Sequence, residues 1–267
     1  MMVHMTSQPT VPSWDKPRPD DDRRLCLAAD IEQYSSFDTP DQRTVQAQLA
    51  RMLRAAAEHS GLDHSKWSVQ PQGDMEFAVL PAGTSEQVVL GEYVTHLAAE
   101  LGGYNATRRR AGRMRLRLAV DTGVATTAAL GFSGPAPIAV ARYLNAPEVK
   151  RALAAAGSAS LVVVISDRLY QDVVRSRFHG HDPEEYRRIH VEQKGFAGYG
   201  WVRLPGVDPQ DAGEPWPDVP EGGPRSPARA AEAERPSFVQ QGIHGTAVQG
   251  VIHGSVIHGV VPGRAGR

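Results

Sequence analysis

A short apolar run that ends on a carboxylate places the strongest limit on how this chain folds. Residues Arg24 to Asp30 read Arg-Leu-Cys-Leu-Ala-Ala-Asp, which predicts a buried strand with a charged residue at its end. A second carboxylate, Asp74, follows a glycine in a tight turn between two short predicted strands, 66–70 and 76–80, and this pattern predicts a hairpin. If the hairpin pairs beside the first strand, both carboxylates face one cleft, where they can bind Mg²⁺ or Mn²⁺ and the phosphates of a nucleotide.

The segments that follow alternate between predicted helices and strands up to about residue 204. Capping residues, proline and glycine mark the helix ends, and β-branched or alternating runs mark the strands. Helices are predicted at 39–60, 85–101 and 136–156, and strands at 114–121, 161–165, 186–191 and 198–204. This order predicts one α/β domain over residues 23–204.

Composition excludes several classes of protein. Of the 267 residues, 41% are hydrophobic, which allows a core of ordinary size. The formal net charge of -1 does not indicate a nucleic-acid or acidic-membrane partner. No apolar stretch reaches the roughly 18 residues that cross a bilayer. The single cysteine, Cys26, excludes an intramolecular disulfide and fits a reducing compartment, so we expect a cytoplasmic protein.

Three further segments differ in composition from this domain. Residues 1–22 are polar and rich in proline, which predicts a disordered leader. Residues 205–236 hold many Pro, Gly, Ala and Glu, which predicts a disordered linker. Residues 237–261 contain an internal repeat of the form (Val/Ile)-(Gln/His)-Gly, as in Val248-Gln249-Gly250-Val251-Ile252-His253-Gly254. The repeat resembles bacterial amyloid-signalling motifs, which pass a signal to an effector protein by templated stacking.

Four motifs, in the same order along the chain, are similar to the catalytic domain of class III adenylyl and guanylyl cyclases. They are Asp30-Ile31-Glu32-Gln33-Tyr34, Gly73-Asp74-Met75-Glu76-Phe77, Ala119-Val120-Asp121-Thr122-Gly123 and Gly134 through Arg142. The resemblance implies an α+β sandwich, with a mixed, mainly antiparallel sheet and helices packed against it. It also implies Mg²⁺ or Mn²⁺ at Asp30, Ile31 and Asp74, and a homodimer in which Arg142 enters the site from the second chain.

The same resemblance implies the substrate contacts and shows where the chain departs from the family. Gln70, Gly73 and Asp121 are the implied substrate-binding residues, and Arg142 is the implied catalytic residue. Gln70 stands where the family has a base-reading lysine or glutamate, Gly131 where it has a base-reading aspartate, and Ile138 where it has an asparagine. Asp121 replaces the usual histidine. The metal aspartates and the arginine are therefore kept, whereas the purine-reading set is not.

Simpler interpretations of the same residues stay open. Asp30 can serve as a helix cap and Asp74 as an ordinary turn residue, and Arg142 can be a surface arginine. Asp121-Thr122-Gly123 is also the triplet of aspartic proteases, but that mechanism needs two such loops and only one is present. The arginine-rich stretch 108–117 can attract phosphates or can be a solvated loop and strand face.

Three functions follow from these features. The first is an enzyme that cyclises a nucleoside triphosphate with a divalent cation, in which Arg142 stabilises the transition state. The second is an inactive domain that senses a nucleotide. The third is an assembly module that recruits, through residues 237–261, an effector protein with the same motif.

A peptide of residues 237–261 tests the assembly hypothesis. Its apolar residues are β-branched, glycine closes each unit, and Gln241 and Gln249 can form amide ladders between stacked copies. We expect thioflavin-positive fibrils at neutral pH and fewer near pH 5, where the protonated histidines repel one another. A peptide that stays soluble, and that circular dichroism shows to be coil-like at both pH values, would contradict the hypothesis.

Overall fold

The computed structural model describes residues 23–177, 180–207, 248–252 and 255–259. The predicted leader, most of the predicted linker and most of the predicted repeat lie outside the described residues. The chain divides into two units between Pro227 and Ala228, and each is described by itself. Within the described ranges, no helix has the length and apolar character that a membrane span requires.

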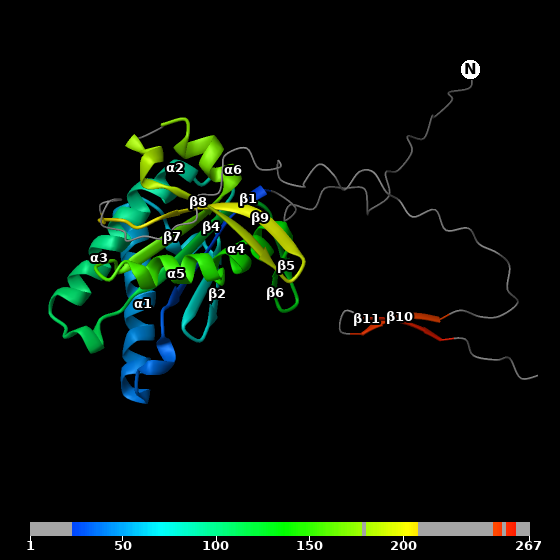
Figure 1. Ribbon diagram of the computed structural model, residues 1–267, viewed down its shortest axis with the longest axis horizontal. Helices are drawn as coiled ribbons and strands as arrows, with labels where there is room; N and C mark the ends of the chain where they lie inside the picture. Colours follow the sequence, from blue (N-terminus) through cyan, green and yellow to red (C-terminus); the bar gives the residue numbers. More distant parts are fainter. Residues whose placement is uncertain (1–22, 178–179, 208–247, 253–254, 260–267) are drawn as a thin grey trace, which may run out of the picture. The chain divides into compact units, whose positions relative to one another are not determined.

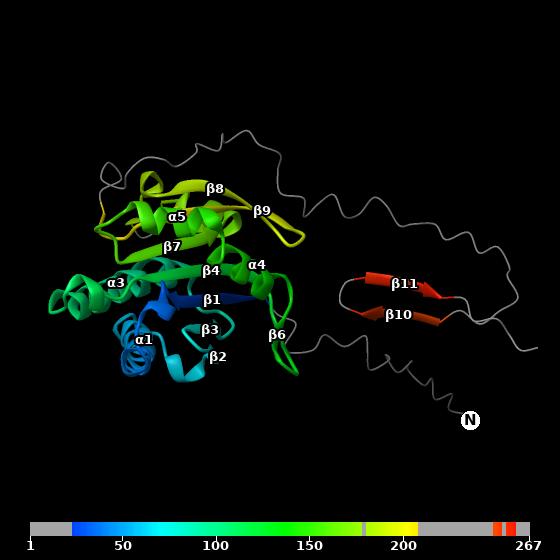
Figure 2. The same cartoon turned by 60° about the horizontal axis from the view of Figure 1, so that its bottom comes forward.

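Seven strands form the central sheet of the first unit. Their order across the sheet is β2-β3-β1-β4-β7-β9-β8, and Figure 2 shows β3, β1, β4 and β7 following one another in this order. Only β4 and β7 are parallel among these neighbours; the other pairs are antiparallel. The strands are β1 (Arg23–Ile31), β2 (Ser68–Gln72), β3 (Met75–Val79), β4 (Leu116–Val124), β7 (Leu161–Ser166), β8 (Arg187–Gln193) and β9 (Phe196–Arg203). The predicted mixed, mainly antiparallel sheet is confirmed.

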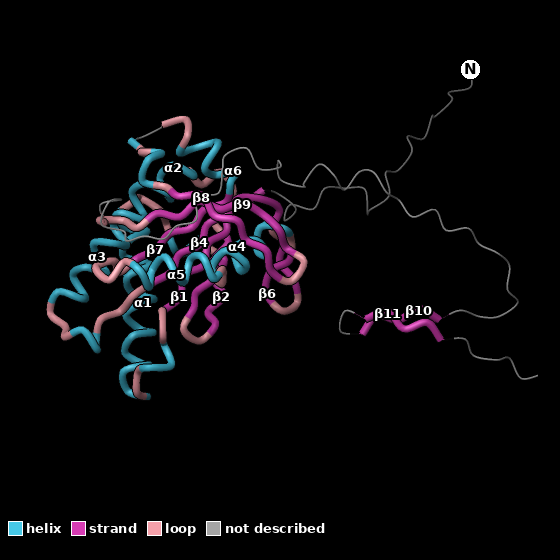
Figure 3. The backbone as a smooth tube through the Cα atoms, in the orientation of Figure 1, coloured by secondary structure: helices cyan, strands magenta, loops and turns pink. Residues whose placement is uncertain are grey.

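Helices cover both faces of this sheet (Figures 1 and 3). On one face α1 and α3 contact each other and share a core with the sheet. On the other face α4 and α5 pack on the sheet over a second core. The helices are α1 (Thr39–His59), α2 (Glu86–Val88), α3 (Val94–Ala106), α4 (Pro135–Leu144), α5 (Pro147–Ala155) and α6 (Asp167–Leu169), with π-helical turns η4 (Val89–Tyr93) and η6 (Tyr170–Val174) and 3-10 turns η2 (Tyr34–Ser36), η3 (His64–Lys66), η5 (Arg110–Gly112) and η8 (Pro183–Glu185).

Strand β1 is buried on both sides because it lies inside the sheet, between β3 and β4. Side chains alternate along a strand, so Leu25 and Leu27 enter the core under α1 and α3. Cys26 and Ala28 enter the core under α4 and α5. Asp30 continues the second series and therefore places its carboxylate on the face that carries α4 and α5.

Two predicted helices have different bounds in the structure. The helix predicted at 136–156 is two helices, α4 and α5, because Pro147 lacks an N–H and begins a new helix. The helix predicted to end at Gly102 continues to Ala106, since Tyr104 and Asn105 are buried beyond the glycines and packing outweighs their low helix propensity. A short hairpin of β5 (Thr126–Ala128) and β6 (Gly131–Ser133) was not predicted.

The second unit contains one antiparallel strand pair among its described residues. Strands β10 (Val248–Ile252) and β11 (Ser255–Gly259) pair in a register that sets Val248 opposite Gly259 and Val251 opposite Val256. The repeat therefore adopts extended backbone at these positions, as its β-branched composition predicts.

Asn105 links α3 to the start of β4 through a buried hydrogen-bond pair. Its amide donates to the Met114 carbonyl and its side-chain oxygen accepts from the Met114 N–H, both at 2.8 Å. We expect Asn105→Ala to lower the free energy of unfolding by about 2–3 kcal/mol, because both backbone groups of Met114 lose their partner in the core. Urea denaturation measures the change.

The matched control is Asn145→Ala at an exposed position after α4, where the amide bonds the Ala141 carbonyl at 3.1 Å. Water replaces that bond, so a change within about 0.5 kcal/mol is expected. Equal losses in the free energy of unfolding would show that the Asn105–Met114 pair stabilises the fold no more than an exposed hydrogen bond does.

Candidate functional site

Asp30 and Arg117 form a buried ion pair between β1 and β4. The two residues are opposite each other in the β1–β4 register. The Arg117 Nε and one terminal nitrogen donate to the two carboxylate oxygens at 2.8 and 2.5 Å, which is a bidentate geometry. Both side chains are close to 10% exposed. The sequence leaves open whether Arg117 attracts phosphates or lies on a solvated strand face, and its pairing with Asp30 is a finding of the structure.

Asp74 lies in the turn that contacts the end of β1, next to Asp30. It follows Gly73 in the turn between β2 and β3, and the positive φ of Gly73, 65°, favours glycine there. The backbone N–H of Ile31 donates to the Asp74 carbonyl at 3.1 Å, which fixes the turn against the end of β1. The Ile31 side chain is buried in the core, so only its backbone can contribute to a site.

Burial and two neighbouring charges, those of Arg117 and Asp74, act on the pKa of Asp30. Burial raises the pKa of the Asp30 carboxyl, and the neighbouring Asp74 charge raises it further. The Arg117 guanidinium acts in the opposite direction and favours the ionised carboxylate. Removing Asp30 would leave Arg117 as an unpaired buried charge, a type of change that costs about 3–5 kcal/mol. Asp74 is therefore the carboxylate that can be substituted without this penalty.

The carboxylate pair fits a divalent cation of the Mg²⁺ type. Mg²⁺ and Mn²⁺ prefer oxygen ligands and are commonly held by one or two carboxylates together with water and phosphate oxygens. Each Asp30 oxygen keeps a lone pair beyond its bond to Arg117, and Asp74 is only half-buried. In the described ranges no group of three or more His, Cys, Asp or Glu residues is suited to a metal. Phosphates or water would have to complete the coordination.

Gln70 and Gly131 lie against each other, although they are far apart along the chain. The Gln70 amide donates to the Leu130 carbonyl at 3.5 Å, beside the turn of the β5–β6 hairpin. A Cβ on Gly131 would lie 2.2 Å from the Gln70 side-chain oxygen, and the φ of Gly131 is 120°. Glycine at position 131 therefore makes room for this glutamine. The two positions identified as the base-reading pair are brought together.

Arg142 and Ile138 lie on α4, one helical turn apart. Arg142 forms no ion pair with Asp30 or Asp74 in the described chain, and its buried Nε has no hydrogen-bond partner there. Ile138 is 52% exposed, which is unusual for a large apolar residue. Within one chain, then, the predicted catalytic arginine is not assembled with the predicted metal aspartates.

Asp121 lies apart from Asp30 and Asp74. It is four residues beyond Arg117 on β4, a separation of about 13 Å along a strand. Its carboxylate is buried and accepts hydrogen bonds from the Thr122 N–H at 2.7 Å and from the Ser166 hydroxyl. Burial raises the pKa of Asp121 to about 6. The structure does not bring this predicted substrate-binding residue to the metal pair.

The sequence contains a signal that identifies Arg117 in retrospect. Two acidic residues two apart at the end of β1, Asp30 and Glu32, match two arginines two apart at the start of β4, Arg117 and Arg115, although Glu32 and Arg115 lie one residue outside these strands. Glu32 and Arg115 form the next ion pair at 3.0 Å. Alternation alone predicts only that the arginines share a face, and the strand register was needed to show that the acids face them.

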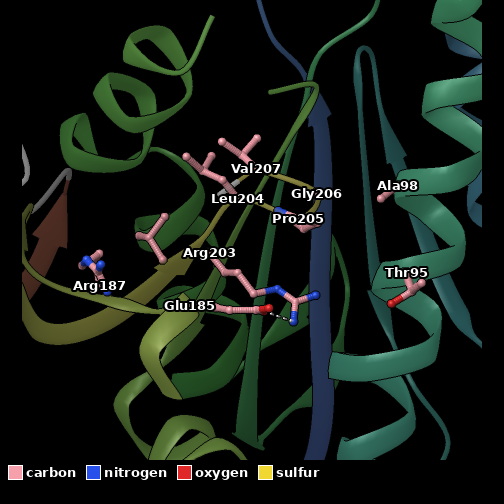
Figure 4. Close-up of a pocket in the computed structure, with 10 residues that line it drawn as sticks. Thr95, Ala98, Glu185, Arg187, Arg203, Leu204, Pro205, Gly206 and Val207 are labelled. Atoms are coloured by element: carbon pink, nitrogen blue, oxygen red, sulfur yellow. Dashed lines mark hydrogen bonds and ion pairs between the residues drawn. The ribbon is translucent and has the colours of Figure 1, made fainter. Parts of the chain in front are cut away.

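A cavity of about 350 Å³ lies away from these residues, between α3 and the end of β9 (Figure 4). Glu185 and Arg203 meet there in an ion pair of 3.2 Å. Figure 4 also shows Thr95 and Ala98 of α3 beside this cavity. None of the residues predicted for the site lines it.

Solved structures of nucleotidyl cyclases are similar to this chain at low sequence identity. No protein-family model and no curated protein matches the sequence. Among solved structures, the guanylyl cyclase Cya2 is similar with a TM-score of 0.49 and 13% identity, over 71% of this chain and 96% of that one. An adenylate/guanylate cyclase/hydrolase from Silicibacter pomeroyi gives 0.49 and 19%, over 70% and 99%. The guanylate cyclase domain of RhGC from Catenaria anguillulae gives 0.44 and 16%, over 69% and 97%.

The buried carboxylate of Asp121 predicts a specific pH dependence. Its folded pKa, about 6, exceeds the ordinary value of 3.8, so the carboxyl favours folding when protonated, below about pH 4, and this contribution is lost as pH rises through 6. Asp121→Asn keeps the shape without the titration. We expect the variant to be more stable than the wild type by about 2–3 kcal/mol at pH 7.5, with the difference shrinking toward pH 4.5, in urea denaturation.

Asp172→Asn is the control, because Asp172 is exposed after α6. It should follow the wild-type pH profile. Parallel profiles for Asp121→Asn and the wild type would contradict the buried-carboxylate interpretation.

Proposed function

We propose that the domain of residues 23–204 binds a nucleoside triphosphate together with Mg²⁺ or Mn²⁺ at Asp30 and Asp74. One observation carries this proposal: the end of β1 and the β2–β3 turn bring two carboxylates together beside Arg117. Two anionic oxygen donors next to a guanidinium suit a cation and the phosphates that accompany it. The Ile31 backbone is a further oxygen donor at the same strand end.

The reaction that this arrangement supports best is cyclisation. The ribose 3′-hydroxyl attacks the α-phosphorus, the bond to the β-phosphate breaks, pyrophosphate leaves, and the hydroxyl proton passes to solvent. The bound cation would supply Lewis-acid stabilisation of the phosphate charge. Arg117 holds Asp30 in place and offers its guanidinium to the same charge. Gly73 gives the turn that carries Asp74 its backbone conformation.

A homodimer would complete the site. Arg142 forms no ion pair with Asp30 or Asp74 within its own chain, and its role as transition-state stabiliser requires that it approach from a second copy. The large apolar residues that the structure leaves exposed, Val124, Leu130 and Ile138, are 38%, 94% and 52% exposed. They belong to β4, the β5–β6 turn and α4, close to Arg142 in sequence or on the same helix. A dimer that covers them would bury apolar surface in the region that carries the arginine.

The base would be read near Gln70. Its amide can donate and accept, so it suits more than one base edge, and the absence of a side chain at Gly131 removes the acidic partner that the family resemblance implies. We therefore propose that any cyclase activity is not selective for adenine. Asp121 would not contact the nucleotide in this scheme, because its carboxylate is buried away from Asp30.

A second candidate function is nucleotide sensing without catalysis, with assembly through the C-terminal repeat. Ile138 and Gly131 favour it, since both differ from the residues that the family resemblance implies at these positions, an asparagine and a base-reading aspartate. The pairing of β10 with β11 shows extended chain in the repeat. In this alternative, an effector protein with the same motif would be recruited by strand stacking.

Asp74→Asn tests the proposed function directly. The substitution removes the charge, keeps the shape, and affects a half-buried turn residue without stranding Arg117. We expect the affinity for Mn²⁺–nucleoside triphosphate to fall at least tenfold in isothermal titration calorimetry, roughly the energy of one charge-assisted contact. The melting temperature should change little.

Asp63→Asn provides the control. Asp63 is an exposed acid that caps a 3-10 turn, and asparagine caps equally well. Its variant should bind as the wild type does. Equal affinity in Asp74→Asn and Asp63→Asn would remove the proposed site. Mass spectrometry of products from four nucleoside triphosphates with Mn²⁺ distinguishes cyclisation from sensing.

A further inference from the structure

The arginines of the stretch 108–117 make different contacts in the structure. Arg108 stacks on the Tyr104 ring at 3.5 Å and donates to the Tyr104 carbonyl. Arg115 and Arg117 are ion-paired with β1. Arg109, Arg110 and Arg113 remain: all three are exposed, and none has a carboxylate within ion-pair distance in the described part of the chain. Of these three, Arg110 and Arg113 line a cavity and Arg109 does not. Arg113 donates through Nε to the Arg108 carbonyl.

These two arginines line a polar cavity of about 820 Å³ at the end of the sheet. Loops from three parts of the chain surround it: the turn after β1, the segment before β4 and the segment between α5 and β7. The lining residues are Glu32, Gln33, Ser36, Phe37, Arg110, Arg113, Arg115, Ala154, Gly157, Ser158, Ala159 and Ser160.

The charges in this cavity favour an anion. Three arginines and one glutamate line it, which leaves a net formal charge of +2. Glu32 is already bound by Arg115 at 3.0 Å. Arg115 also donates to the carbonyls of Leu153, Ala156 and Ala159 at the end of α5, so the negative end of that helix dipole is compensated. The positive charges of Arg110 and Arg113 are left without a counter-charge.

The cavity begins next to the carboxylate pair. Glu32 comes just after β1 and Arg115 just before β4, each two residues from Asp30 and Arg117, and the Glu32 N–H donates to the Arg115 carbonyl at 2.8 Å, which continues the strand pairing by one step. Two residues along a strand span about 7 Å, which is the scale of a polyphosphate chain. A polyphosphate held at Asp30 can therefore extend past the Glu32–Arg115 pair toward Arg110 and Arg113.

We propose that this cavity is a polyphosphate site in which Arg110 and Arg113 bind the terminal phosphates of the nucleotide and retain pyrophosphate. Its role toward the nucleotide rests on the function proposed above, whereas its affinity for a free polyphosphate does not. Arginine suits this ligand because its planar guanidinium donates two parallel bonds to phosphate oxygens. The Ser158 hydroxyl is a further donor in the wall.

Calorimetric titration of the full chain with inorganic pyrophosphate, without divalent metal or nucleotide, tests the site. We expect the wild type to bind and Arg110→Ala and Arg113→Ala to weaken binding by roughly fivefold to tenfold each. Arg109→Ala is the matched control, since Arg109 is exposed in the same run but does not line the cavity. It should leave the affinity unchanged. All three side chains are exposed, so the variants should fold, and melting temperatures verify this.

Two results would overturn the proposal. No binding of pyrophosphate to the wild type shows that the cavity is not an anion site. Equal weakening by Arg109→Ala and the two cavity variants shows attraction by overall charge only.

A second titration separates this proposal from the proposed function. With Mn²⁺, Arg110→Ala should lower the affinity for a nucleoside triphosphate and leave that for the monophosphate unchanged. If no nucleotide binds but pyrophosphate binds through Arg110, the proposed function fails and the anion site stands. If the triphosphate binds and Arg110→Ala changes nothing, the anion site is wrong and the proposed function stands.

Discussion

The bidentate ion pair of Asp30 and Arg117 is the interaction on which the functional end of the sheet depends. It joins β1 and β4 at the point where β1 leaves the core, and both side chains are nearly buried. Burial raises the pKa of the Asp30 carboxyl, and the Arg117 guanidinium acts to lower it. Arg117 also holds the two Asp30 oxygens in a fixed plane, beside the turn that carries Asp74.

Around this pair, the strand register orders the remaining charges. Just past the ends of the two strands, Glu32 and Arg115 form a second pair, and Arg115 also donates to the carbonyls of Leu153 in α5 and of Ala156 and Ala159 after it. Asp30 and Glu32 are thereby each paired with an arginine, Asp74 keeps its negative charge, and the cavity beyond them carries the positive charges of Arg110 and Arg113. The result is a gradient from a negative carboxylate pair to a positive cavity, which matches a cation followed by a chain of phosphates.

The α4 side of the domain has a different character. Gln70 fills the space that Gly131 leaves, and the exposed apolar residues Leu130 and Ile138 lie on the elements around them. Arg142 lies on the same helix as Ile138 and forms no ion pair with Asp30 or Asp74 of its own chain. In the function proposed above, catalysis and sensing differ in whether Arg142 of a second copy reaches the phosphates.

The sequence by itself determined the local structure: the strand that ends on Asp30, the long helix α1, and the glycine turn that presents Asp74. Each follows from periodicity and from capping or turn residues within a short stretch of chain. It did not determine where the predicted helix at 136–156 divides, nor that the helix after residue 85 continues through two glycines, because packing of Asn105 and Tyr104 outweighs propensity there. Only the tertiary structure decided that Arg117 is the partner of Asp30, that Gln70 meets Gly131, and that Asp121 stands apart from the carboxylate pair. These facts depend on strand register and on contacts between residues about 60 to 90 positions apart, and residue spacing along one chain carries no information about register.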